Sequence, residues 1–143
     1  RNLPAFLAKD PGLNSGFMIV QYTAASLVSL NKQLTTPSSA DNADSSNGQE
    51  DHVSMGANAA LKLWQVIEQA EQVLAIEALC AAQASDLGHL AGLGKMSPKL
   101  QKLQDAFRAE LPFLEEDAYM SPFIESAHDF IALNSPVELS ICH

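Results

Sequence analysis

Apolar side chains recur at helical spacing along most of this chain, and no stretch shows the two-residue alternation of a strand. The pattern predicts a helix that Asn14 or Ser15 caps and that runs to about Leu34. Its apolar residues point in nearly every direction, so we expect protein all around it: Phe17, Met18, Ile19, Val20, Ala24, Leu27, Val28 and Leu30. Residues 1–13, which contain two prolines, are predicted to be an irregular segment.

A second and longer helix is predicted from about Gln49 to Leu87, a stretch without proline and with Gly56 as its only glycine. Its apolar positions also recur at helical spacing: Leu63, Ile67, Ala70, Leu74, Ala81 and Ala84. At about 1.5 Å per residue, such a helix is roughly 55 Å long, which exceeds the diameter of a small compact domain. We therefore expect it to need partners along its whole length, of which this chain supplies few.

Two shorter helices are predicted near the end of the chain. Ser97-Pro98 and Ser121-Pro122 each combine a capping serine with a proline at the first helical position. The first of these helices should end before Pro112 and the second at about Leu133, with an irregular segment over residues 136–143. The predicted fold class is all-α, a long-helix bundle formed as a single helical segment over residues 1–143. Its surplus of apolar surface indicates a part of a larger bundle or an oligomer.

A polar loop over residues 35–48 separates the two long helices. Its sequence, TTPSSADNADSSNG, contains no large apolar side chain. Structureless loops of this length are uncommon in compact domains unless they are functional or disordered. A mobile surface linker and a functional loop are both compatible with this composition.

The densest polar cluster follows this loop and comprises Gln49, Glu50, Asp51 and His52. Acidic residues in a first helical turn ordinarily pair with free N–H groups, and on that interpretation Asp51 caps the long helix. Alternatively, an acid at a loop–helix junction can face a pocket and exchange a proton with a substrate. Adjacent helical side chains point about 100° apart and do not easily share one ion, so we expect no metal site here.

Composition narrows the function classes. Hydrophobic residues make up 47% and charged residues 17% of 143 residues, which excludes a disordered acidic tail. The formal net charge of −9 argues against nucleic acid and against an anionic membrane surface as partners. Polar residues interrupt the most apolar stretch, residues 16–34, so we expect no membrane span. Cys80 and Cys142 form no CxxC pair, and a reduced, cytoplasmic setting is the simplest interpretation.

Several blocks of the sequence resemble the C-terminal region of the histidine ammonia-lyases, and the resemblance extends over about residues 2–132. The most specific block is QEDHVSMG at residues 49–56, because the related phenylalanine and tyrosine enzymes usually have aspartate directly after the glutamine. The other blocks are GLNSGFMI at 12–19, PSSAD at 37–41, VLAIE at 73–77 and SPKL at 97–100.

The resemblance implies a mostly helical homotetramer whose active sites combine several subunits. It implies elimination of ammonia from L-histidine to give urocanate, with a methylidene-imidazolone electrophile made from an internal Ala-Ser-Gly. This chain has no Ala-Ser-Gly, so alone it is expected to be inactive and to require the remainder of the enzyme chain as a partner. By the same resemblance, Glu50 lies near the substrate imidazole as a catalytic and substrate-binding residue, and Gln49 is a further substrate-binding residue.

Three residues depart from the family pattern. Gly48 stands where asparagine is usual, Leu30 where glutamate is usual, and Asp44 where proline is common. Two alternatives remain beside a histidine ammonia-lyase. One is a related aryl ammonia-lyase or aminomutase that acts on an aromatic amino acid, and the other is a non-catalytic helical assembly module.

Overall fold

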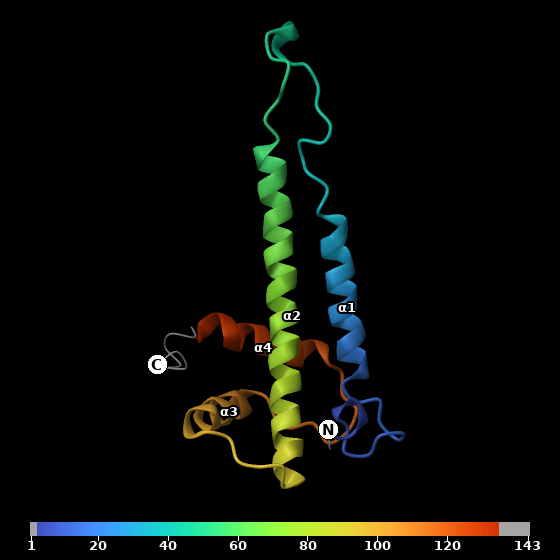
Figure 1. The fold of residues 1–143 in the computed structure, drawn as a ribbon, viewed down its shortest axis with the longest axis vertical. Helices are drawn as coiled ribbons and strands as arrows, with labels where there is room; N and C mark the ends of the chain where they lie inside the picture. Colours follow the sequence, from blue (N-terminus) through green and yellow to red (C-terminus); the bar gives the residue numbers. More distant parts are fainter. Residues whose placement is uncertain (1–2, 135–143) are drawn as a thin grey trace.

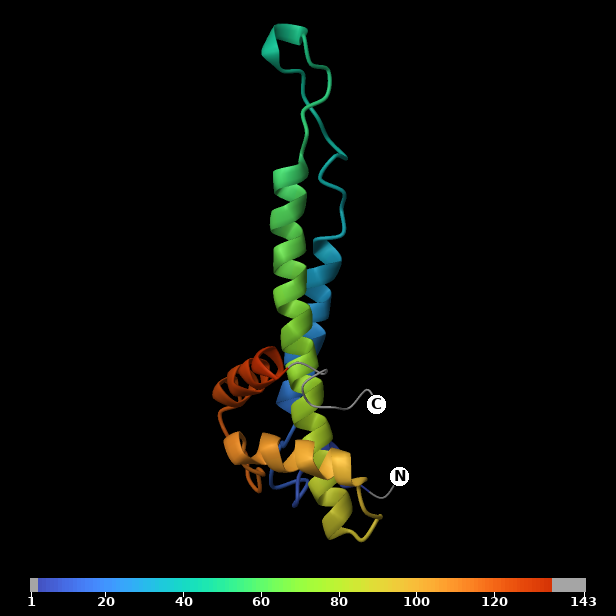
Figure 2. The same cartoon turned by 90° about the vertical axis from the view of Figure 1, so that its left-hand side faces the viewer.

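The computed structural model describes residues 3–134, and over this range it is helical without a strand, as the apolar spacing predicts. Helix α1 (Met18–Gln33) and helix α2 (Gly56–Leu90) run antiparallel, side by side, as a long hairpin. Helices α3 (Pro98–Glu110) and α4 (Ser121–Leu133) lie across the C-terminal half of α2 (Figures 1 and 2). A short 3-10 turn, η1 (Ala5–Leu7), precedes α1. No helix within residues 3–134 is both long and apolar enough to cross a bilayer.

The hydrophobic core lies where the C-terminal half of α2 meets the other helices. Small side chains there, such as Ala75 and Ala127, are fully buried and allow the helices to approach closely. The rings of Phe107 on α3 and Phe130 on α4 pack edge to face, with centroids 5.1 Å apart. The remaining members of the core are Phe17, Val20, Ile76, Leu79, Ala82, Leu111 and Met120.

The opposite half of the hairpin has no comparable core. Val20 is the only buried residue of α1, and no buried residue of α2 precedes Ala75. Tyr22 on α1 is 69% exposed, and Trp64 on α2 is 67% exposed. Within this chain α1 is therefore not surrounded by protein, and apolar side chains of both long helices face outwards.

A buried amide fastens the loops at the base of the molecule to α2. Gln83 is only 1% exposed, and its Nε2 donates to the carbonyl oxygens of Leu114, at 2.7 Å, and Leu7, at 3.3 Å. The N–H of Leu114 donates in turn to Gln83 Oε1 at 3.3 Å. These bonds satisfy a polar group that would otherwise be costly to bury.

The predicted starts of the two shorter helices meet different outcomes. Ser97 caps α3 as predicted, because its hydroxyl accepts the N–H of Leu100. The prediction that Ser121 caps α4 is wrong, since the N-cap is Met120 and the Ser121 hydroxyl donates to Glu125 instead. The end of α3 before Pro112 and the end of α4 at Leu133 are confirmed, whereas residues 136–143, including Cys142, lie outside the described residues.

The predicted cap of α1 by Asn14 or Ser15 is also wrong. The helix begins at Met18 with Phe17 as N-cap, and no side chain of its own segment caps it. The free N–H groups before it are instead satisfied by Asp117, a residue distant in the sequence. Asn14 takes part in the same contact, because its side-chain oxygen accepts the N–H of Asp117.

The long helix begins later than the spacing predicts, at Gly56 rather than near Gln49, and continues to Leu90. The residues before Gly56 are held by hydrogen bonds across the polar loop, which compete with the i to i−4 pattern of a helix. The N-cap is Met55, and no side chain caps this end. The interpretation in which Asp51 caps the long helix is therefore wrong.

Candidate active-site loop

The segment between α1 and α2 extends beyond both helices and forms the far end of the molecule (Figure 1). Its tip contains a second 3-10 turn, η2 (Ser46–Gly48). Gln49 and Glu50 directly follow this turn, so the structure places both candidate site residues at the tip of the loop. Both residues are exposed in this chain.

Two hydrogen-bonded pairs join the arms of the loop. The side-chain amide of Asn42 acts like a peptide group, since Oδ1 accepts the N–H of Val53 at 2.8 Å and Nδ2 donates to the Val53 carbonyl at 2.9 Å. Closer to the tip, the N–H of Ser45 donates to the Glu50 carbonyl at 2.9 Å, and the N–H of Glu50 donates back at 3.3 Å. Together these bonds give the polar loop the form of a small hairpin.

The turn at the tip requires a left-handed backbone. Ser46, Asn47 and Gly48 have φ values of 53°, 58° and 79°. Glycine and asparagine are the residues that adopt this conformation most readily. Gly48 replaces the asparagine that the resemblance leads one to expect, and the substitution is therefore compatible with the same backbone path.

Glu50 offers a carboxylate that is only partly engaged. Its Oε2 accepts the Ser45 hydroxyl at 3.2 Å, and no second hydrogen bond reaches this carboxylate from the residues that the structure describes. The Gln49 side chain likewise makes no hydrogen bond within residues 3–134. Both side chains are thus available to a ligand or to another part of a larger protein.

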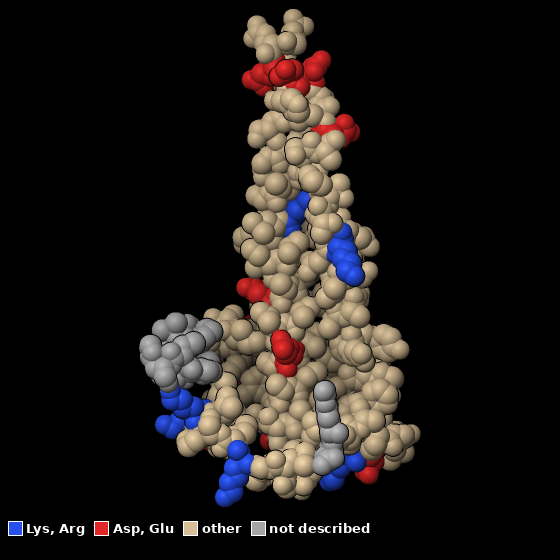
Figure 3. Space-filling view, viewed as in Figure 1, with Lys and Arg blue, Asp and Glu red and all other residues tan. Residues whose placement is uncertain are grey.

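The tip is negatively charged. Its acidic side chains are Asp41, Asp44, Glu50 and Asp51, and the sequence contains no lysine or arginine between Lys32 and Lys62. Figure 3 shows this acidic group at the end of the molecule, with blue side chains on the hairpin below it and around the base. Such a charge distribution favours a cationic ligand group over an anionic one.

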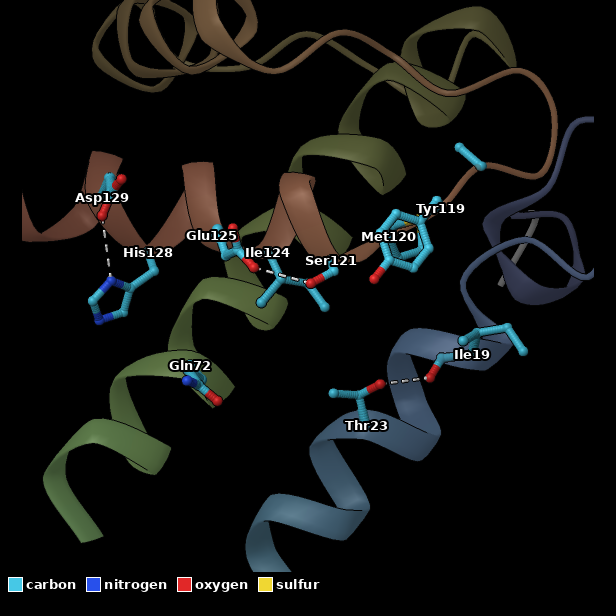
Figure 4. Close-up of a pocket in the computed structure, with 11 residues that line it drawn as sticks. Ile19, Thr23, Gln72, Tyr119, Met120, Ser121, Ile124, Glu125, His128 and Asp129 are labelled. Carbon is cyan, nitrogen blue, oxygen red and sulfur yellow. Dashed lines mark hydrogen bonds and ion pairs between the residues drawn. The ribbon is translucent and has the colours of Figure 1, made fainter. Parts of the chain in front are cut away.

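A separate cavity of about 670 Å³ lies at the base, between α1, α2 and α4 (Figure 4). His128 lines it, with Nε2 at 3.3 Å from Glu71 Oε2 and Nδ1 at 3.6 Å from Asp129 Oδ1. The Tyr119 ring also faces the cavity. Sequence reasoning did not single out the pair of His128 and Glu71, because these residues are 57 positions apart and no local pattern links them.

The structure does not bring the candidate site residues to this cavity, since neither Gln49 nor Glu50 is among its lining residues. Within the described range, no three or more His, Cys, Asp or Glu side chains gather as a metal site would require. The chain also cannot form a methylidene-imidazolone, because no Ala-Ser-Gly occurs in it. The chemistry that its own residues offer at the tip is hydrogen bonding and proton exchange by carboxylates, that of Glu50 among them.

Comparison with known proteins gives consistent matches. A sequence model of the family described as aromatic amino acid lyase matches residues 1–109. A histidine ammonia-lyase from Staphylococcus aureus (strain USA300) is 46% identical over 142 residues, which are 99% of this chain and 27% of that protein. The chain thus spans about 27% of the length of the curated relatives that it matches.

Solved structures agree on the fold. The crystal structure of histidine ammonia-lyase from Trypanosoma cruzi superposes with a TM-score of 0.85 at 42% identity, covering 92% of this chain and 25% of that one. A tyrosine aminomutase from Streptomyces globisporus superposes with a TM-score of 0.78 at 39% identity, covering 89% of this chain and 24% of that one. The helical arrangement is therefore shared by enzymes whose names indicate different substrates and reactions.

Proposed function

This chain belongs to the aromatic amino acid lyase family, and from that premise we propose that it is the C-terminal part of a histidine ammonia-lyase. The proposed reaction is the non-oxidative elimination of ammonia from L-histidine to give urocanate. The observation that carries the proposal is Glu50 itself. It follows Gln49 within the QEDHVSMG block and lies at an acidic tip with a partly free carboxylate.

We assign Glu50 a catalytic and substrate-binding role. A carboxylate can accept a hydrogen bond from an imidazole N–H, can stabilise an imidazolium and can take up a proton. The absence of lysine and arginine around the tip leaves no neighbouring cation in the loop to neutralise it. Gln49, exposed beside it, is proposed as a second substrate-binding residue through its side-chain amide.

The rest of the active site is proposed to come from outside this chain. The electrophile would be supplied by an Ala-Ser-Gly in the remainder of the enzyme. The exposed apolar faces of α1 and α2 support burial against that remainder and against other subunits, for which we propose a homotetramer. We propose a cytoplasmic location, because the two cysteines show no spacing typical of a secreted disulfide framework.

A related aryl ammonia-lyase or aminomutase is the second candidate. The fold similarity to a tyrosine aminomutase favours it, since the shared helices do not discriminate among substrates. The glutamate at position 50 favours histidine, because its carboxylate is suited to an imidazole N–H rather than to a phenyl ring. A non-catalytic assembly module is the third candidate, and activity in the complete enzyme would exclude it.

The experiment compares the complete enzyme that contains this segment with the 143-residue chain alone. Each is supplied with histidine, tyrosine and phenylalanine, and formation of the unsaturated acid is followed by ultraviolet absorbance. We expect urocanate from the complete enzyme with histidine as the preferred substrate, and no product from the 143-residue chain. Preferred turnover of tyrosine or phenylalanine would support the second candidate, and no turnover of any of the three would contradict the proposed function.

A further inference from the structure

Glu50 is held by a residue that the family resemblance does not assign. We propose that Ser45 is a positioning residue, which orients the Glu50 carboxylate so that one of its oxygens is presented to the substrate. The inference rests on the proposed function, because it concerns how the proposed catalytic carboxylate is set. On this proposal, the hydroxyl of Ser45 contributes to turnover through its hydrogen bond to Glu50 and not through packing.

Three hydrogen bonds join Ser45 and Glu50. Their peptide groups exchange two N–H···O bonds, of 2.9 and 3.3 Å, which makes them an antiparallel pair directly opposite each other. Side chains of such a pair lie on the same face of the ribbon. The Ser45 hydroxyl is therefore placed to reach the Glu50 side chain, and it donates to Oε2 at 3.2 Å.

This contact divides the carboxylate into two oxygens with different roles. Oε2 is occupied by Ser45, whereas Oε1 accepts no hydrogen bond from any residue that the structure describes. A glutamate side chain in open solvent samples many rotamers, and one charge-assisted bond to a fixed partner restricts them. Ser45 thus presents Oε1 in a defined direction, which matters because catalysis depends on the geometry of the reacting groups.

The fixed position of Ser45 has two sources. Its own backbone is extended, with φ −135° and ψ 175°, and the paired arms of the loop hold it there. Three residues further from the tip on each arm, the Asn42 side-chain amide bonds to the backbone of Val53 and joins the same two arms. These bonds hold the Ser45 backbone, and with it the Cβ that carries the hydroxyl, within reach of the Glu50 carboxylate.

The test uses the complete enzyme, the four single variants S45A, S45T, S39A and E50A, and the double variant S45A/E50A. S45A removes the hydroxyl, whereas S45T keeps it in a residue well suited to an extended backbone. S39A is the matched control, because Ser39 lies in the same loop and donates no hydrogen bond to Glu50. E50A, alone and combined with S45A, shows whether the effect of Ser45 passes through Glu50.

We expect S45A to lower kcat by about ten-fold, the lower end of the range for a hydrogen bond to a charged group, with KM changed by less than about two-fold. S45T should restore most of kcat, S39A should match the parent enzyme, and S45A should add nothing in the E50A background. The melting temperature of S45A should equal that of the parent, which separates orientation from loss of fold.

Normal turnover by S45A, or an equal loss in the E50A background, would overturn the role of Ser45 while leaving Glu50 catalytic. A full effect of S45A together with normal turnover by E50A would overturn it as well, and would also contradict the proposed site. If the enzyme prefers another aromatic amino acid to histidine, the kinetics of the parent, S45A, E50A and the double variant are measured with that substrate. The same results then support or overturn the role of Ser45.

Discussion

The carboxylate of Asp117 accepts the backbone N–H of Gly16, 101 positions earlier in the chain, at 2.7 Å. It also accepts the N–H of Ser15 at 2.9 Å, and Asn14 closes the contact by accepting the N–H of Asp117. These bonds fasten the connection between α3 and α4 to the start of α1. The backbone donors of Ser15 and then Gly16 lower the pKa of Asp117 from its ordinary value of 3.8, because they stabilise the charged form.

The first prediction concerns this contact and pH. Since the pKa of Asp117 is lower in the folded state, its contribution is complete above pH 3.8 and is lost as the pH falls through the folded value. D117N should therefore melt at a lower temperature than the parent chain at pH 7, and the difference should shrink below about pH 4. Melting curves between pH 7 and pH 2.5 measure this. D51N, in an exposed loop position, is the control and should melt like the parent; a pH-independent difference for D117N would contradict the account.

The second prediction compares two glycines. Gly16 has a φ of +53°, and a Cβ there would lie 2.6 Å from the Phe6 carbonyl oxygen and 2.9 Å from the Ala8 Cβ. Gly88 lies within α2, and its nearest neighbours would be side-chain atoms at 3.9 Å. G16A should lower the free energy of unfolding by about 2 kcal/mol or more, whereas G88A should raise it by about 0.5–1 kcal/mol.

Urea unfolding of both variants measures these changes. A similar effect of the two substitutions would show that the close approach at Gly16 does not constrain the fold. An increase in stability for G16A would contradict the structure directly.

The helices, their approximate ends and the start of α3 follow from local sequence, whereas the starts of α1 and α2 depend on partners elsewhere in the chain. The spacing of apolar residues predicts α1 and α2, and the Ser97-Pro98 pair predicts the start of α3, because both signals are contained within one segment. The α1 start is not predictable in this way, since Asp117 satisfies the N–H groups of Ser15 and Gly16, the residues just before the helix. The start of α2 is missed because Asn42 pairs with Val53 across the loop.

At the candidate site, too, local sequence predicts one part, and contacts between separate segments decide the rest. The block around Glu50 makes this residue a candidate from sequence alone, and the structure places it at a hairpin tip instead of in a first helical turn. The Ser45 partner could not be found by pattern, since a serine in a polar loop resembles every other serine there. The pair of His128 and Glu71 joins two helices and likewise leaves no local signal.

The third prediction is that the 143-residue chain self-associates. Leu61 is 67% exposed, Leu63 is 59% exposed, and Trp64 is 67% exposed, all on the half of α2 that lacks a core. Apolar patches beyond a few hundred Å² rarely persist on monomers. Sedimentation at micromolar concentration should therefore show species larger than a monomer.

The double variant L61Q/W64Q should shift this equilibrium towards the monomer. L133Q is the control, because Leu133 is 79% exposed but lies at the end of α4, on a different helix from Leu61 and Trp64. A parent chain that sediments as a compact monomer would contradict the inference that α1 and α2 bury these faces in a larger assembly.

The central claim is that Glu50 acts on the substrate, and the most direct measurement is kcat/KM for histidine in the complete enzyme carrying E50Q. Glutamine has nearly the same shape but is neutral and takes up no proton at ordinary pH. We expect a loss of at least about ten-fold from orientation, and of about 10²–10⁴-fold if Glu50 transfers a proton. The melting temperature should not change, because Glu50 caps no helix and its side chain makes a single hydrogen bond within residues 3–134. D51N should retain kcat/KM within about two-fold, as expected for a surface substitution without a partner. If E50Q retains the parent kcat/KM while its melting temperature falls, Glu50 is a structural residue of the loop and the assignment of the site is wrong.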